Sequence, residues 1–133
     1  MKQFAIGIDI GSTCAKAVVL DAEKRILERF LLPTGWSSVE TAEKQKEQLS
    51  SWMPDAVTVA TGYGRSCVPF ADRSVTEITC HGKGAACLTG GLVDLPYLRQ
   101  ALEKKLGSPV VTSPDGRYAG AIGAALLAGR GGK

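Results

Sequence analysis

The sequence lacks long apolar runs, a strong net charge and a leader-like start, and each absence excludes a class of protein. No apolar stretch approaches the ~18 residues needed to cross a bilayer, so we expect no membrane helix. The net charge is only +3 and is spread along the chain, which gives no electrostatic case for a nucleic-acid partner. Because Met1, Lys2 and Gln3 lead straight into a strand-like run, we expect no signal peptide and a cytoplasmic protein.

The four cysteines and the single histidine form no recognisable site. Cys14, Cys67, Cys80 and Cys87 lack CxxC spacing, and three of them stand beside small or apolar residues, so we interpret them as free thiols. His81 has no serine and aspartate around it in the pattern of a catalytic triad. A thiol or iron–sulfur redox function is the hypothesis that this pattern favours least.

What the sequence does contain is the length and composition of one globular domain. The chain has 133 residues, of which 44% are hydrophobic and 22% are charged. It has no internal repeats and no low-complexity linker. We therefore expect a single α/β domain over residues 1–133.

Apolar and alternating runs predict the strands. Residues 4–10, 15–20 and 25–32 are joined by short polar turns, which is typical of an antiparallel meander. Shorter strands are expected at residues 56–60 and 75–78, with a further short strand at 109–112.

Three segments are predicted to be helices. Ser37 and Glu40 form a capping box that begins the first, which Pro54 ends. The second extends from Asp94 as the N-cap to Gly107 as the stop. The third is YAGAIGAALLAG, residues 118–129, whose small side chains would let it pack close to a sheet. The predicted apolar face of the first helix consists of Val39, Ala42, Leu49, Trp52 and Met53.

A meander followed by alternating strands and helices predicts an α/β fold with a mixed sheet, in the ribonuclease-H-like order of elements. The stretch FAIGIDIGSTCAKAVVL, which opens this meander, interrupts two apolar runs with polar residues. A carboxylate at Asp9 costs free energy at the end of an apolar strand unless it is paired or binds a cation.

Two interpretations of that stretch are open. In one, Gly11, Ser12 and Thr13 aim amides and hydroxyls at an anion, while Asp9 holds Mg²⁺ through water. Lys16 would lie near the same end and add a positive charge. In the other, the segment is a hairpin turn in which Asp9 only caps the following amides.

Two further glycine loops follow strands. TGYGR, residues 61–65, comes directly after a strand, where ligands collect in open α/β sheets, although a plain loop explains the motif alone. In LTGGLVD, residues 88–94, the glycines Gly90 and Gly91 precede a helix and would let a flat ring or a phosphate approach the backbone. A tight turn explains this second motif nearly as well.

In combination, these motifs resemble a known family. GIDIGST with AKAVVL is similar to the first phosphate loop of the superfamily of sugar kinases, actin and heat-shock chaperone ATPases. LTGG resembles its adenosine loop, and GAIGAALLA resembles the helix that closes its nucleotide domain. With TGYGR, ADRSVTEITCHGKGA and SPDGRYAGAIGAAL, the chain resembles the ATP-dependent activators of 2-hydroxyacyl-CoA dehydratases, the BadF/BadG/BcrA/BcrD ATPase family.

The resemblance implies one half of an actin-like ATPase that binds ATP or ADP with Mg²⁺. ATP hydrolysis and an acyl-CoA dehydratase component as partner are implied by the family alone. It assigns metal and phosphate contacts to Asp9, Gly11, Ser12 and Thr13, and adenosine contacts to Gly90 and Gly91.

The resemblance comes in two blocks. Residues 1 to about 84 match the start of an activator and about 86 to 133 match its end, with a junction near 84–87. The family's middle section, with its second phosphate loop and its iron–sulfur cysteines, is missing, so no cluster is expected. Phosphoryl transfer needs charge on both sides of the γ-phosphate, so half a cleft should bind weakly and hydrolyse slowly at best.

Two hypotheses follow from this half cleft. In the first, two copies associate about a two-fold axis and rebuild the cleft as a homodimer. In the second, the chain is a minimised or engineered half-fold scaffold that folds and dimerises without a functional nucleotide site. Calorimetric titration with ADP and ATP distinguishes the two.

Overall fold

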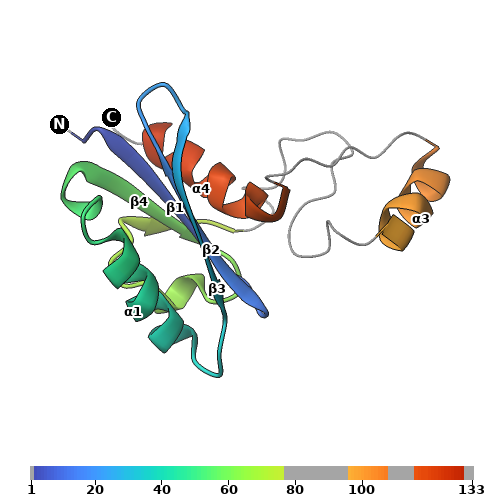
Figure 1. Ribbon diagram of the computed structural model, residues 1–133, viewed down its shortest axis with the longest axis horizontal. Coiled ribbons are helices and arrows are strands. Elements are labelled where there is room, and N and C mark those ends of the chain that lie inside the picture. The colour runs from blue at the N-terminus through green and yellow to red at the C-terminus, as the bar shows by residue number, and fades with distance from the viewer. Residues whose placement is uncertain (1, 77–95, 108–115, 131–133) are drawn as a thin grey trace.

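The computed structural model describes residues 2–76, 96–107 and 116–130, which contain a five-stranded sheet with a helix on each face (Figure 1). The strands lie in the order β3-β2-β1-β4-β5. β1 pairs antiparallel with β2 and β2 with β3, whereas β1–β4 and β4–β5 are parallel pairs. This confirms the predicted meander and mixed sheet. The strands are β1 (Phe4–Ile10), β2 (Cys14–Leu20), β3 (Ile26–Pro33), β4 (Ala56–Thr61) and β5 (Arg73–Ser74).

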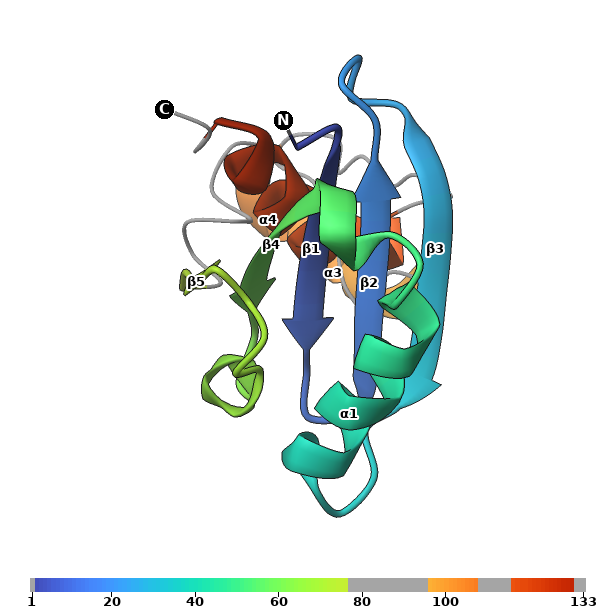
Figure 2. The same cartoon turned by 90° about the vertical axis from the view of Figure 1, so that its left-hand side faces the viewer.

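Helices α1 and α4 cover opposite faces of this sheet, as Figure 2 shows with α1 in front and α4 behind. The α-helices are α1 (Ser38–Leu49), α3 (Pro96–Leu106) and α4 (Ala119–Arg130). Short 3-10 turns occur at η1 (Met53–Asp55), η2 (Arg65–Cys67) and η3 (Gly116–Tyr118). Among the described residues, no helix is long and apolar enough to span a membrane.

The core has two layers because β1 and β2 are buried on both faces. Ile6, Ile8 and Ile10 pack on the α1 side, and Ala5 packs on the α4 side, as the alternation of side chains along a strand requires. Such strands read as nearly continuous apolar runs, which is why their positions were predictable.

Helix α4 lies unusually close to the sheet. A Cβ on Gly7 would overlap the carbonyl of Ala121 and come within 2.5 Å of the Ala125 nitrogen, so only glycine fits there. On the helix, the residues that face the sheet are alanines, and all are buried. The predicted close packing is confirmed, with the decisive glycine on the strand.

The first helix differs from its prediction in its extent and in its apolar face. It ends at Leu49, and Pro54 belongs instead to η1. Val39 is 56% exposed, because at 100° per residue it lies roughly 100° around the helix from the middle of the buried stripe. That stripe consists of Thr41, Ala42, Gln45 and Leu49.

The predicted start of the first helix and the predicted end of the second are both seen. The Ser37 hydroxyl accepts a hydrogen bond from the Glu40 amide at 3.3 Å, as an N-cap does. Gly107 ends α3 with a φ of +66°, and its N–H donates to the Glu103 carbonyl. Asp94, the 84–87 junction and the predicted strand at 109–112 lie outside the described residues.

The turn between β2 and β3 is held by an acidic side chain. The Asp21 carboxylate accepts hydrogen bonds from the backbone amides of Arg25 and Glu23, and from the Arg25 guanidinium, each at 2.9 Å. These donors, led by the Arg25 amide, lower the pKa of the Asp21 carboxyl. The stabilisation of this turn is therefore present at neutral pH and is lost as the pH falls through that lowered pKa.

Candidate functional site

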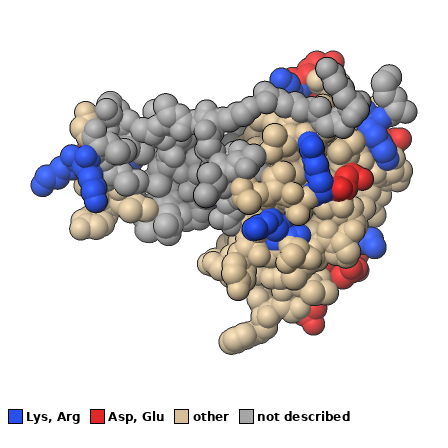
Figure 3. All heavy atoms as spheres, turned by 180° about the vertical axis from the view of Figure 1, so that it is seen from behind, with Lys and Arg blue, Asp and Glu red and all other residues tan. Residues whose placement is uncertain are grey.

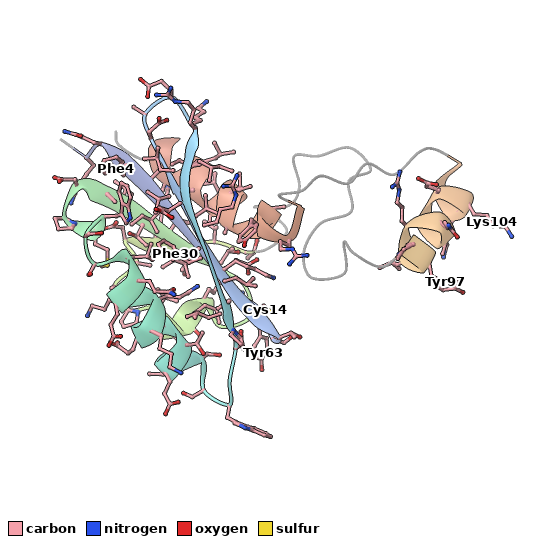
Figure 4. All side chains as sticks on the ribbon, in the orientation of Figure 1. Phe4, Cys14, Phe30, Tyr63, Tyr97 and Lys104 are labelled. Atoms are coloured by element: carbon pink, nitrogen blue, oxygen red, sulfur yellow. The ribbon has the colours of Figure 1, made fainter. Side chains whose placement is uncertain are left out.

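The ends of β1 and β4 bring two sequence-distant loops to one edge of the sheet. These strands are parallel, so the loops that follow them leave from the same edge. The Gly64 amide, in the loop after β4, donates to the Ile10 carbonyl at the end of β1 at 2.9 Å. Figure 4 accordingly shows Cys14 and Tyr63 at the same end of the sheet, with Phe4 toward the other.

Three polar side chains gather at this edge, and we call Asp9, Lys16 and Thr61 the strand-end cluster. Asp9 stands opposite Lys16 in the antiparallel register and opposite Thr61 in the parallel register. Paired positions of neighbouring strands share a face of the sheet, so the three side chains lie on the α4 side. Their exposed fractions are 7%, 6% and 0%. A carboxylate and an ammonium that are both buried have to be paired with each other or bind ions, which makes this edge the candidate site.

The direction of α4 adds to the positive potential at this cluster. Gly129 lies beside Ala5 and Ala121 lies beside Gly7, so the helix runs antiparallel to β1. Its N-terminus therefore points toward the end of β1 that carries Asp9. The N-terminal end of a helix macrodipole favours anions, as does the Lys16 ammonium.

Gly62 holds the loop after β4 tightly against Asp9. Its φ is +94°, a conformation that favours glycine, and a Cβ there would lie 2.5 Å from the Asp9 Oδ1 and 2.5 Å from the Ile10 carbonyl oxygen. The Arg65 guanidinium donates to the Gly62 carbonyl at 3.1 Å, which closes the loop. The TGYGR loop therefore packs directly against Asp9 and the end of β1.

The turn between β1 and β2 is a tight hairpin. The Gly11 amide donates to the Cys14 carbonyl at 3.1 Å, so phosphate contacts at this turn would fall to the exposed Ser12 and Thr13. Thr34 steadies the turn, because its amide donates to the Thr13 carbonyl and its hydroxyl to the Gly11 carbonyl, each at 2.8 Å. A Cβ on Gly11 would lie 3.0 Å from the Cys14 carbonyl oxygen.

The donor set fits a hydrated magnesium ion. Within the described ranges, no three His, Cys, Asp or Glu side chains come together as a metal cage. Asp9 supplies one carboxylate and Thr61 one neutral oxygen, which suits Mg²⁺ because this ion keeps several waters and takes phosphate oxygens as ligands.

The structure places most of the predicted site residues in one region. Asp9, Gly11 and Lys16 lie together, with Ser12 and Thr13 on the adjoining turn. Gly90 and Gly91 lie outside the described residues, as do Cys80, His81 and Cys87. Cys14 and Cys67 are free thiols.

Thr61 and Gly62 were not among the residues assigned to the site. The signal that pointed to them was the position of TGYGR directly after a strand, which became specific only when that strand was found to pair with β1.

The charge on the visible surface carries no single-sign patch. Figure 3 shows Lys and Arg side chains interspersed with Asp and Glu over this face of the sheet region.

Comparison with known proteins gives a consistent set of relatives. The model of the BadF/BadG/BcrA/BcrD ATPase family matches residues 6–94. The uncharacterized protein YjiL of Escherichia coli K12 is 41% identical over 96 residues, which cover 69% of this chain and 37% of YjiL. The (R)-2-hydroxyglutaryl-CoA dehydratase activating ATPase of Acidaminococcus fermentans is 33% identical over 97 residues, covering 65% and 35%. The chain thus spans about a third of the length of the curated relatives it matches.

Solved structures show the same fold. The Acidaminococcus fermentans (R)-2-hydroxyglutaryl-CoA dehydratase component A aligns with a TM-score of 0.81 at 20% identity, over 97% of this chain and 98% of that chain. The activator of the 2-hydroxyisocaproyl-CoA dehydratase from Clostridium difficile, with bound ADPNP, aligns with a TM-score of 0.78 at 15% identity, over 96% and 94%. The predicted α/β fold of the actin-like ATPase type is confirmed.

Proposed function

The chain belongs to the BadF/BadG/BcrA/BcrD ATPase family, and on that premise we propose that it binds ATP or ADP with Mg²⁺ at the ends of β1, β2 and β4. The observation that carries the proposal is the buried Asp9, which stands between Lys16 and Thr61 directly before a glycine turn. The ADPNP bound to the Clostridium difficile activator supports the nature of the ligand.

Each residue has a role that its position supports. Asp9 holds Mg²⁺ through water, and the Lys16 ammonium neutralises part of the charge of the phosphates. Ser12 and Thr13 donate to phosphate oxygens from the exposed turn. Gly90 and Gly91 flank the adenosine, as the family resemblance implies. When bound, Mg²⁺ would offset charge on the phosphate chain.

One copy supplies one phosphate turn, so the proposed active form is a homodimer. Three exposed apolar side chains support this, since large apolar side chains in water favour an interface. Tyr63 is 81% exposed in TGYGR, and Trp36 is 107% exposed two residues beyond the Thr34 that bonds to the phosphate turn. Val39 is also exposed at 56%, on the first turn of α1. A two-fold dimer through this end would cover them and bring two copies of Asp9 to one cleft.

The two-block origin of the chain is part of the same proposal. The structural alignment extends over 98% of the Acidaminococcus component A, whereas the sequence match covers 35% of the Acidaminococcus activating ATPase. Two blocks from the ends of an activator, joined near 84–87, would give this difference. Hydrolysis by such a half site should be slow or absent, without an iron–sulfur cluster, and a dehydratase partner rests on the family alone.

Isothermal titration of the chain with ATP and ADP, with and without Mg²⁺, tests the site. The parent should bind Mg·ATP, and Asp9→Ala should weaken that binding at least tenfold, while far-ultraviolet circular dichroism stays unchanged. Asp55→Ala, which removes an exposed carboxylate at the other end of β4, is the matched control and should bind like the parent. Equal affinities of Asp9→Ala and the parent would remove the role given to Asp9.

A further inference from the structure

Thr61 carries a buried hydroxyl group whose hydrogen-bonding capacity is unused. The residue is fully buried, and its Oγ1 has no hydrogen-bond partner in the part of the chain that the structure describes. An unpaired buried hydroxyl costs free energy, and valine would fill the same volume in a strand without that cost. The hydroxyl therefore calls for a partner that arrives with a ligand.

The surroundings of Thr61 identify where that partner binds. Asp9 lies directly across the parallel register, and neighbouring strands are about 4.8 Å apart, so a single small group can touch both side chains. Lys16 lies on the other side of Asp9, and the N-terminus of α4 points toward the same edge. Asp9 thus has the Lys16 ammonium on one neighbouring strand and the Thr61 hydroxyl oxygen on the other.

Full burial limits the size of the partner. In the ligand-free structure nothing the size of a water touches this residue, so a partner reaches the hydroxyl only if neighbouring side chains shift, and a single water requires a smaller shift than a phosphate chain does. Mg²⁺ retains several waters when it binds proteins, and each of these waters needs hydrogen-bond acceptors. A threonine hydroxyl is such an acceptor.

We propose that the Thr61 hydroxyl accepts a hydrogen bond from a water on the Mg²⁺ that Asp9 holds, which makes Thr61 a positioning residue for the metal. The inference rests on the proposed nucleotide function and deepens it. The loop after Thr61 is held close to Asp9, because Gly62 fits against the Asp9 carboxylate and the Gly64 amide donates to the Ile10 carbonyl. These contacts hold the end of β4 in register with Asp9.

Three variants test the proposal. Thr61→Val removes the hydroxyl at nearly constant volume, and Thr61→Ser keeps it. Thr58→Val is the control, three residues earlier in β4 and on its opposite, α1 face. In the ligand-free protein, Thr61→Val should melt at or above the parent temperature, because it removes an unpaired polar atom. In calorimetry with Mg·ATP, Thr61→Val should bind at least tenfold more weakly than the parent. Thr61→Ser and Thr58→Val should stay within about twofold.

The metal dependence separates this role from a contact with the nucleotide itself. With ATP in EDTA, the parent and Thr61→Val should bind with equal affinity, because the water that the hydroxyl holds is absent. A tenfold loss that persists in EDTA would overturn the proposal, as would Mg·ATP binding by Thr61→Val within twofold of the parent.

Failure of this inference differs from failure of the nucleotide function. If the parent binds Mg·ATP, Asp9→Ala loses it and Thr61→Val retains it, only the role of Thr61 falls. If the parent does not bind Mg·ATP at all, both proposals fall. A lower melting temperature for ligand-free Thr61→Val, together with unchanged binding, would assign the hydroxyl a structural role instead.

Discussion

At the scale of single residues, the buried polar side chains of the described residues include two contrasting cases. Asp9, Lys16 and Thr61 share one edge of the sheet, where a ligand can use them. Gln45 lies instead on the inner face of α1, fully buried, and both of its amide atoms lack a partner among the described residues. It occupies a position where the 3–4 spacing of the helix places an apolar side chain.

Replacing Gln45 should therefore stabilise the protein. Gln45→Met keeps a long, flexible side chain and removes two unpaired polar atoms, which together should raise the free energy of unfolding by about 1–2 kcal/mol. Thermal unfolding should show an increase of a few degrees.

Gln48→Met on the exposed side of the same helix is the matched control and should leave the melting temperature almost unchanged. A destabilised Gln45→Met would mean that the amide has a partner in solution, which would contradict its assignment as an unpaired group.

The candidate site was predictable at this scale only where its residues adjoin one turn. Asp9, Gly11 and Lys16 lie within eight positions of one another, so their proximity follows from a hairpin. Thr61 meets Asp9 through a parallel pairing across fifty-two positions, and no local pattern encodes such a pairing. The orphan hydroxyl of Thr61 is visible only once its burial is known.

At the scale of elements, the contact between α4 and β1 depends on the absence of one side chain. Gly7 sits where any Cβ would overlap the backbone of α4, and backbone cannot move aside as a flexible side chain can. The helix and strand bury alanines and apolar strand residues against each other along this line. Removing the close approach would open the α4 layer of the core.

Gly7→Ala should consequently lower the free energy of unfolding by about 3 kcal/mol or more, which is large for a domain of marginal stability. Urea unfolding followed by circular dichroism measures it. Gly35→Ala, with nothing within 4 Å of the added Cβ, provides the comparison and should change stability by less than about 0.5 kcal/mol. Equal midpoints for the two variants would show that α4 packs elsewhere.

The helices and strands were predictable where their own sequences show a clear apolar or small-residue pattern. β1 and β2 are apolar on both faces, and α4 is continuous in small residues, so their bounds were placed to within one residue. β5 has only two residues, Arg73 and Ser74, and both are exposed, so its sequence has no alternation to read. The exposure of Val39 depends on which side of α1 meets the sheet, a tertiary choice that composition does not encode.

At the scale of the whole molecule, one end of the sheet exposes large apolar side chains to solvent. The turn between β1 and β2, TGYGR and the start of α1 meet there. Hydrogen bonds of Thr34 to that turn and of Gly64 to the end of β1 join them. Trp36 and Tyr63 are exposed at this end, whereas the equally exposed Tyr97 belongs to α3, which stands to one side of the sheet in Figure 1. This placement makes the dimer proposal specific about its face.

The molar mass in solution should be close to twice 14.0 kDa when Mg·ATP is present. The reason is that two copies of the chain then form one cleft around the nucleotide, so binding favours the dimer. Light scattering coupled to size exclusion measures it with and without nucleotide. Trp36→Ser should shift the protein toward the monomer and weaken Mg·ATP binding together, whereas Tyr97→Ser, which removes another exposed aromatic ring, on α3, should change neither. A monomeric mass that Mg·ATP leaves unchanged would refute the dimer, and a dimer insensitive to Trp36→Ser would place its interface on another face.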